Sequence, residues 1–130
     1  MMELLSSEQY RRVVLTLKQI EKAIIQLQEW NKNVLSVDDY LNTPEGTKNL
    51  AATCMMIEAI GEAFKKIDVY TQGNLLPLYP SIPWKAVKGI RDHIAHGYFE
   101  IDAEIIFSTV SENLSPLLDA TRFFLEKLKD

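Results

Sequence analysis

Five side chains suited to acid–base or phosphate chemistry lie within eight positions of the segment "GIRDHIAHGYFEID", residues 89–102. They are Arg91, Asp92, His93, His96 and Tyr98. Arginine presents a planar fork of donors that matches phosphate and carboxylate groups, and histidine gains or loses a proton near neutral pH. A carboxylate four positions before a histidine can orient its imidazole ring if the segment is helical. This segment is therefore the candidate site.

The apolar spacing predicts a helix from Trp84 to about Gly97 that carries these groups. At about 100° per residue, one broad stripe holds Trp84, Val87, Ile90, Ile94 and Tyr98. Arg91 falls inside that stripe, where a guanidinium needs an anionic partner or a ligand because an unpaired buried charge is costly. An adjoining face holds Lys85, Lys88, Asp92 and His96. The segment is thus locally basic.

Simpler interpretations of the same residues stay open at this stage. Arg91 could form an ion pair with Glu58 or Glu62 across a bundle, and His96 could be a solvent-facing residue near the negative end of a helix dipole. His93 and His96 form an H-x-x-H pair, but no carboxylate or cysteine joins them at familiar ligand spacing. We therefore expect no metal site.

The rest of the chain predicts an all-α, single-domain antiparallel helical bundle over residues 1–130. Ser6 with Gln9 forms a capping box for a helix that ends near Trp30. Thr43 and Pro44 begin a helix that runs to about Val69. Its expected inner face consists of Leu50, Cys54, Ile57, Ile60, Phe64 and Ile67.

A further pair of helices is predicted after the candidate site. Asp102 is the expected cap of a helix over residues 103–113. Ser115 and Pro116 then either kink the chain or restart it as a last helix. No stretch alternates between apolar and polar residues as a half-buried strand would.

Composition narrows the functional class. The chain has 130 residues, a net charge of −4 and a pI near 5.2, which argue against a broad basic surface that binds duplex nucleic acid. Cys54 is the only cysteine, so no internal disulfide forms, and its apolar surroundings favour a buried structural thiol. No segment has the length of a membrane span or the pattern of a signal peptide, so we expect a cytoplasmic protein without membrane contact.

The string "RDHIAHGY" resembles the Arg-x-x-x-x-His-x-Tyr signature of HEPN-domain toxins, and specifically of the HepT-like branch. The segments "IEAIGEAFKKI" at 57–67, "YPSIPWKAVKGIRDHIAHGYFEID" at 79–102 and "NLSPLL" at 113–118 resemble that branch in order and spacing. The likeness covers most of the chain. It implies a HEPN-like bundle that dimerises around the motif helix.

The resemblance implies a metal-independent, cofactor-free endoribonuclease toxin of a type VII-like toxin–antitoxin pair. Arg91 and His96 would be the catalytic pair, one binding the phosphate and the other transferring a proton. Asp92 would orient His96, while Lys85, Lys88 and His93 could contact RNA. Tyr98 would be AMPylated by a minimal nucleotidyltransferase that serves as the antitoxin.

Two other functions compete with the nuclease. The chain could be a non-enzymatic helical module that binds a nucleotide or serves as the docking partner of a minimal nucleotidyltransferase. It could also be a purely structural bundle, in which Tyr98 packs near a helix end with its hydroxyl satisfied. The first of these predicts complex formation without RNA turnover, and the second predicts neither.

Overall fold

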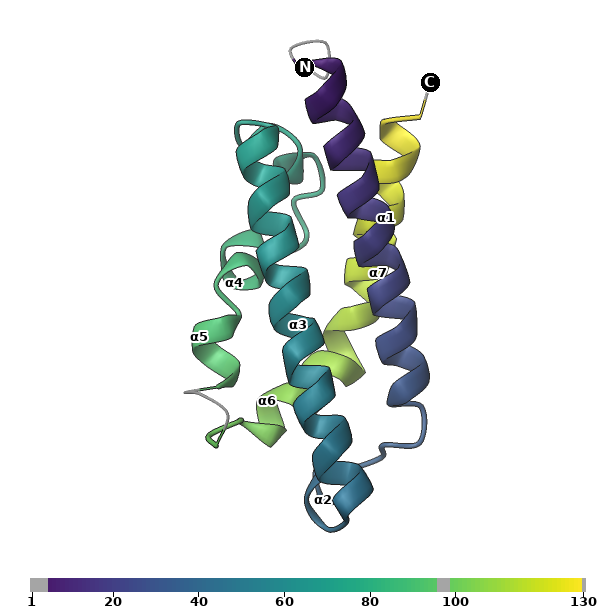
Figure 1. Ribbon diagram of the computed structural model, residues 1–130, viewed down its shortest axis with the longest axis vertical. Helices are drawn as coiled ribbons and strands as arrows, with labels where there is room; N and C mark the ends of the chain where they lie inside the picture. Colours follow the sequence, from purple (N-terminus) through teal and green to yellow (C-terminus); the bar gives the residue numbers. More distant parts are fainter. Residues whose placement is uncertain (1–4, 96–98, 130) are drawn as a thin grey trace.

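The computed structural model describes residues 5–95 and 99–129, so His96 and Tyr98 lie outside the described residues. Two long helices, α1 (Ser7–Trp30) and α3 (Pro44–Tyr70), lie side by side and run in opposite directions, and α7 (Leu114–Lys127) packs against α1 (Figure 1). The shorter elements are α2 (Asp38–Leu41), the 3-10 turn η2 (Leu76–Leu78), α4 (Trp84–Lys88), α5 (Arg91–Ile94), α6 (Ala103–Ser108) and the π-helical turn η3 (Thr109–Asn113). The all-α prediction is confirmed.

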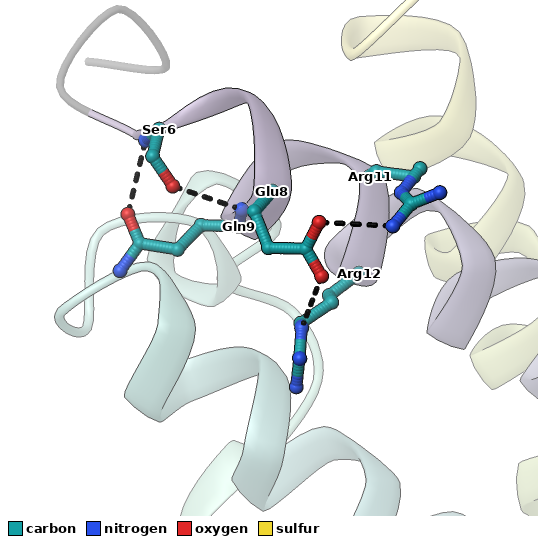
Figure 2. Close-up of polar contacts among 5 residues, drawn as sticks. All are labelled: Ser6, Glu8, Gln9, Arg11 and Arg12. Carbon is teal, nitrogen blue, oxygen red and sulfur yellow. Dashed lines mark hydrogen bonds and ion pairs between the residues drawn. The ribbon is translucent and has the colours of Figure 1, made fainter.

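Helix α1 begins and ends where its sequence signals predict. The Ser6 hydroxyl accepts from the Gln9 N–H at 3.1 Å, and the Gln9 side chain accepts from the Ser6 N–H at 3.0 Å (Figure 2). This reciprocal capping satisfies two backbone donors that the first helical turn leaves without partners. The buried stripe of α1 consists of Val13, Leu17, Ile20, Ile24 and Leu27.

Helix α3 is the central element of the fold, because α1, α2, α4, α5 and α6 all contact it. Thr43 caps it by accepting from the Gly46 N–H at 2.9 Å, and Pro44 occupies its first position as predicted. All six expected inner-face residues are buried. Gly46 lets α2 pack closely, since a Cβ there would lie 2.1 Å from the Asp39 carbonyl oxygen.

A buried polar network, termed the Asn31 network, joins the end of α1 to α2 and α3. Asn31 donates to the Leu27 carbonyl at 2.8 Å and to the Thr53 hydroxyl at 3.1 Å. The Tyr40 hydroxyl donates to the Asn31 side-chain oxygen at 2.7 Å, and Asn49 donates to the same oxygen at 3.2 Å. Tyr40 is fully buried, and this burial raises its pKa to about 12. These hydrogen bonds fix how the three helices meet.

The second half of the chain returns along the bundle through α6, η3 and α7. Asp102 caps α6 as predicted, accepting from the Ile105 N–H at 3.0 Å. The helix expected over 103–113 leaves α geometry at Thr109, and α7 begins at Leu114. Pro116 has no N–H to donate one turn back, which favours a widened turn just before it. Of the two predicted alternatives, a kink or a restart, the structure has neither a gap nor a new start: the helical path continues from α6 to α7 through the π-helical turn just ahead of the proline.

Buried apolar side chains of the helices form one core cluster. No helix of the described ranges is both long enough and apolar enough to cross a membrane.

Candidate active site

The candidate site is carried by residues 84–95, here called the α4–α5 arm, which lies on the outer side of α3 (Figure 1). Trp84 fixes the start of the arm. Its indole N–H donates to the Tyr79 carbonyl at 2.9 Å, and its ring lies 5.0 Å from that of Phe64 and 5.7 Å from that of Phe124. The proline-rich loop after α3 thus places α4 against the aromatic core.

Gly61 lets the arm approach the backbone of α3. A Cβ at this position would lie 2.8 Å from both the Val87 carbonyl oxygen and the Ile90 Cγ2 atom. Glycine inside a helix costs about 1 kcal/mol relative to alanine, so its presence in "IEAIGEAFKKI" is a signal of close packing. Gly61 is therefore a residue of the site that was not predicted, although its position inside a helical segment was visible in the sequence.

The prediction of a single helix from Trp84 to about Gly97 is wrong. Helix α4 ends at Lys88, Gly89 and Ile90 form a tight turn, and α5 contains only Arg91–Ile94. Ala95 is extended, with φ −158° and ψ 145°, and forms an isolated antiparallel bridge with Ile101. The Asp102 N–H donates to the Ile94 carbonyl at 2.7 Å. This contact ties the end of α5 to the start of α6.

The break changes where the site residues lie. Ile94 is fully buried, but Arg91 is exposed, so it does not lie inside a buried stripe as the continuous wheel predicted. Asp92 and His93 are exposed beside it. Helix α5 ends at Ile94 and Ala95 is extended, so the continuous helix from which the Asp92–His96 pairing was predicted is absent.

Glu58 and Glu62, the two carboxylates that could have formed an ion pair with Arg91, do not pair with it in the structure. Among the described residues, no ion pair joins Arg91 to Glu58 or Glu62. Glu62 instead lies 3.7 Å from the Lys65 ammonium on its own helix. The guanidinium is therefore on a solvent-facing surface where a ligand can reach it.

The two lysines of the arm, Lys85 and Lys88, differ in their surroundings. Lys85 is exposed, whereas the Lys88 ammonium donates to the Asp68 carboxylate of α3 at 2.6 Å. The helical wheel placed both lysines on the same polar face. Asp68 was missed because nothing in the sequence pattern links it to a residue twenty positions later.

An apolar cleft of about 170 Å³ lies next to the arm, between α3, α4 and the η3–α7 junction. Its lining includes Ile57, Gly61, Ala86, Val87, Ile90 and Leu117. Phe99, just beyond the arm, has a fully exposed side chain. Neither the cleft nor the exposure of Phe99 was predicted from the sequence.

The described side chains also bear on metal and thiol chemistry. No group of three or more His, Cys, Asp or Glu residues within residues 5–95 and 99–129 is arranged to hold a metal ion. Cys54 is buried, and this burial, together with the nearby Glu58 carboxylate, raises the pKa of its thiol to about 11. The thiol is therefore protonated at neutral pH, as expected of a structural cysteine.

Comparison with known proteins gives concordant matches. A family model described as "Ribonuclease HepT-like" matches residues 18–123. A protein of Thermococcus cleftensis named "Probable ribonuclease HepT" is 31% identical over 101 residues, covering 78% of this chain and 84% of the relative. A protein of Caldanaerobacter subterraneus subsp. tengcongensis, named provisionally as an RNase, is 28% identical over 95 residues, covering 73% and 79%. No solved structure matches significantly.

Proposed function

The chain belongs to the HepT-like ribonuclease family, and we propose that it is a metal-independent endoribonuclease toxin of a type VII-like toxin–antitoxin pair. The family match is the observation that carries this proposal, since it spans the whole candidate site. The exposed position of Arg91 on an arm fixed to the core supports it. So does the named ribonuclease relative, which is aligned with most of both chains.

The proposed reaction uses Arg91 and His96 from two copies of the chain in a cytoplasmic homodimer. One His96 takes the proton of an RNA 2′-hydroxyl, whose oxygen attacks the adjacent phosphorus. The bond to the 5′-oxygen breaks, and that oxygen takes a proton from His96 of the partner subunit. The Arg91 guanidinium stabilises the additional negative charge on the phosphate with paired donors. The products are a 2′,3′-cyclic phosphate and a 5′-hydroxyl.

Neighbouring side chains have supporting roles in this proposal. Asp92 is proposed to orient the His96 imidazole. Lys85 and His93 are exposed and contact the RNA backbone. DNA is not a substrate, since it lacks the attacking 2′-hydroxyl.

Control of the toxin is proposed to act at Tyr98. A minimal nucleotidyltransferase, the antitoxin, transfers AMP to its hydroxyl. The added phosphate would place negative charge and bulk at the proposed RNA cleft, so RNA is excluded by repulsion and by steric overlap.

The nuclease is tested by incubating the purified protein with single-stranded RNA in excess chelator. We expect cleavage with 2′,3′-cyclic phosphate ends, and we expect Arg91→Ala and His96→Ala each to lower kcat by about 10²–10⁴-fold. Arg11→Ala is the matched control, because Arg11 is an exposed arginine of α1 far along the chain from the arm. Equal cleavage by the Arg91 and Arg11 variants would refute the assignment.

The same purified protein can be used to distinguish the nuclease from the non-enzymatic alternative. A docking module forms a complex with the nucleotidyltransferase but turns over no RNA, which co-purification with an RNase assay distinguishes. In the proposed system, AMPylated protein loses its RNase activity, and Tyr98→Phe remains active in the presence of the nucleotidyltransferase and ATP.

A further inference from the structure

The α4–α5 arm carries an ion pair that the reaction described above does not use. The Lys88 ammonium lies 2.6 Å from the Asp68 carboxylate, and the two side chains are only 30% and 24% exposed. Two ion pairs in the described part of the chain join different helices, this one between α4 and α3 and Arg122–Glu21 between α7 and α1. Partial burial makes such a charged hydrogen bond stronger than the exposed pairs on single helices.

The arm depends on contacts of this kind because its helices are too short to hold themselves. Helix α4 has five residues and α5 has four, and helices of that length are not stable alone in water. Trp84 anchors the beginning of α4, and Ile94 is buried at the end of α5. Lys88 is the last residue of α4, directly before the turn at Gly89 and Ile90 that leads to Arg91.

We propose that Asp68 and Lys88 are positioning residues, whose ion pair holds the end of α4 on α3 and thereby sets the place of the Arg91 guanidinium. This inference rests on the proposed nuclease function. If the pair is broken, the turn after α4 is free to rotate, and Arg91 moves relative to the phosphate. Because Lys88 is already bound to a carboxylate, it does not contact RNA.

Substitutions at Asp68 and Lys88 should change kcat and KM differently if Lys88 positions Arg91 than if Lys88 binds RNA. Positioning predicts that Asp68→Asn and Lys88→Met both lower kcat by about 10- to 100-fold with little change in KM. Lys88→Arg retains the ion pair and most of the activity. If Lys88 instead binds RNA, Lys88→Met raises KM, whereas Asp68→Asn releases the lysine, leaves kcat intact and lowers KM. That second pattern would overturn the proposal.

Controls separate positioning from general stability. Glu21→Gln breaks the Arg122–Glu21 pair, which has an N···O distance of 3.0 Å and lies away from the arm. We expect it to leave kcat unchanged at a temperature where all variants are folded by circular dichroism. The double variant Asp68→Lys with Lys88→Asp restores the pair with reversed charges, so it should recover part of the lost kcat. Failure of Asp68→Asn to lower kcat in the folded protein would overturn the proposal.

A second readout does not depend on catalysis. Hydrogen exchange should become faster at the amides of residues 85–94 in Asp68→Asn, while the amides of α1 keep their wild-type protection. If the wild-type protein cleaves no RNA, the nuclease proposal fails, yet this measurement still shows whether the pair holds the arm. Unchanged exchange in the arm would overturn the positioning role whatever the activity.

Discussion

The long helices around the Asn31 network and the α4–α5 arm are held in place in different ways. Helices α1 and α3 have continuous apolar stripes, their own N-terminal caps and a buried set of hydrogen bonds where they meet α2. The arm has short helices without side-chain caps, and it is fixed by Trp84, by the close approach at Gly61 and by the Lys88–Asp68 pair. Signals in the local sequence determine the structure of the long helices, whereas contacts with residues distant in the sequence determine the position of the arm.

This difference bears on how the candidate site works. An arm that is fixed at a few points can present an arginine to solvent while its neighbours Ile90 and Ile94 pack inward. If the positioning proposal holds, the loss of a single contact would shift the exposed residues of the arm. Changes in the arm should therefore affect activity more than stability, and changes at the Asn31 network should do the reverse.

The largest combined effect is expected for Gly61→Ala. The added Cβ would lie 2.8 Å from the Val87 carbonyl oxygen, so α4 must move away from α3. We expect a loss of about 1–3 kcal/mol in the free energy of unfolding and a fall in kcat of about 10- to 100-fold. Urea denaturation and RNA cleavage measure the two quantities.

Gly89→Ala is the matched control for this change. Gly89 has φ −102°, which alanine adopts readily, and its Cβ would meet the Lys85 carbonyl oxygen at an ordinary 3.4 Å. This variant should retain the stability and kcat of the wild type. Equal losses in both glycine variants would show that the loss of a glycine, rather than the close approach of α4 to α3 at Gly61, causes the effect.

The same division explains what the sequence could predict. The capping box at Ser6 and Gln9 and the cap at Thr43 are local signals, so the starts of α1 and α3 were predicted correctly. Whether residues 84–97 form one helix depends on contacts with Gly61, Asp68 and Ile101, which lie far away in the sequence. A periodic stripe cannot reveal that a helix breaks to make such contacts. The residue types of the site were visible in the sequence, and their arrangement was not.

A smaller effect, on stability alone, is expected for Asn31→Ala. The change removes the acceptor of the fully buried Tyr40 hydroxyl, and an unsatisfied buried donor costs about 1–3 kcal/mol. The fall should appear in urea denaturation, whereas kcat per folded molecule stays at the wild-type value. Asn33→Ala, at an exposed asparagine two positions later, is the control and should change neither quantity. A large loss of kcat in Asn31→Ala would contradict the independence of the two regions.

The smallest effect is expected at the N-terminal turn of α1, where Glu8 binds both Arg11 and Arg12 at 2.9 Å on an exposed surface (Figure 2). The Arg12 hydrogen bond, followed by that of Arg11, lowers the pKa of Glu8 below its usual 4.5. A carboxyl group whose pKa is lower in the folded state adds stability above its unfolded pKa, and this stability is lost as the pH falls through the folded pKa. Glu8→Gln should therefore be slightly less stable than the wild type at pH 7, and the two should converge in acid.

Salt provides the internal control for that last comparison, because exposed ion pairs are screened at high ionic strength. The difference between Glu8→Gln and the wild type should shrink in 1 M NaCl at pH 7, where Debye screening acts over about 3 Å. The effect of Asn31→Ala, which depends on a buried neutral hydrogen bond, should persist under the same conditions. If salt abolished the effect of Asn31→Ala as well, the long-helix region would depend on surface charge rather than on its buried network, and the contrast with the arm would disappear.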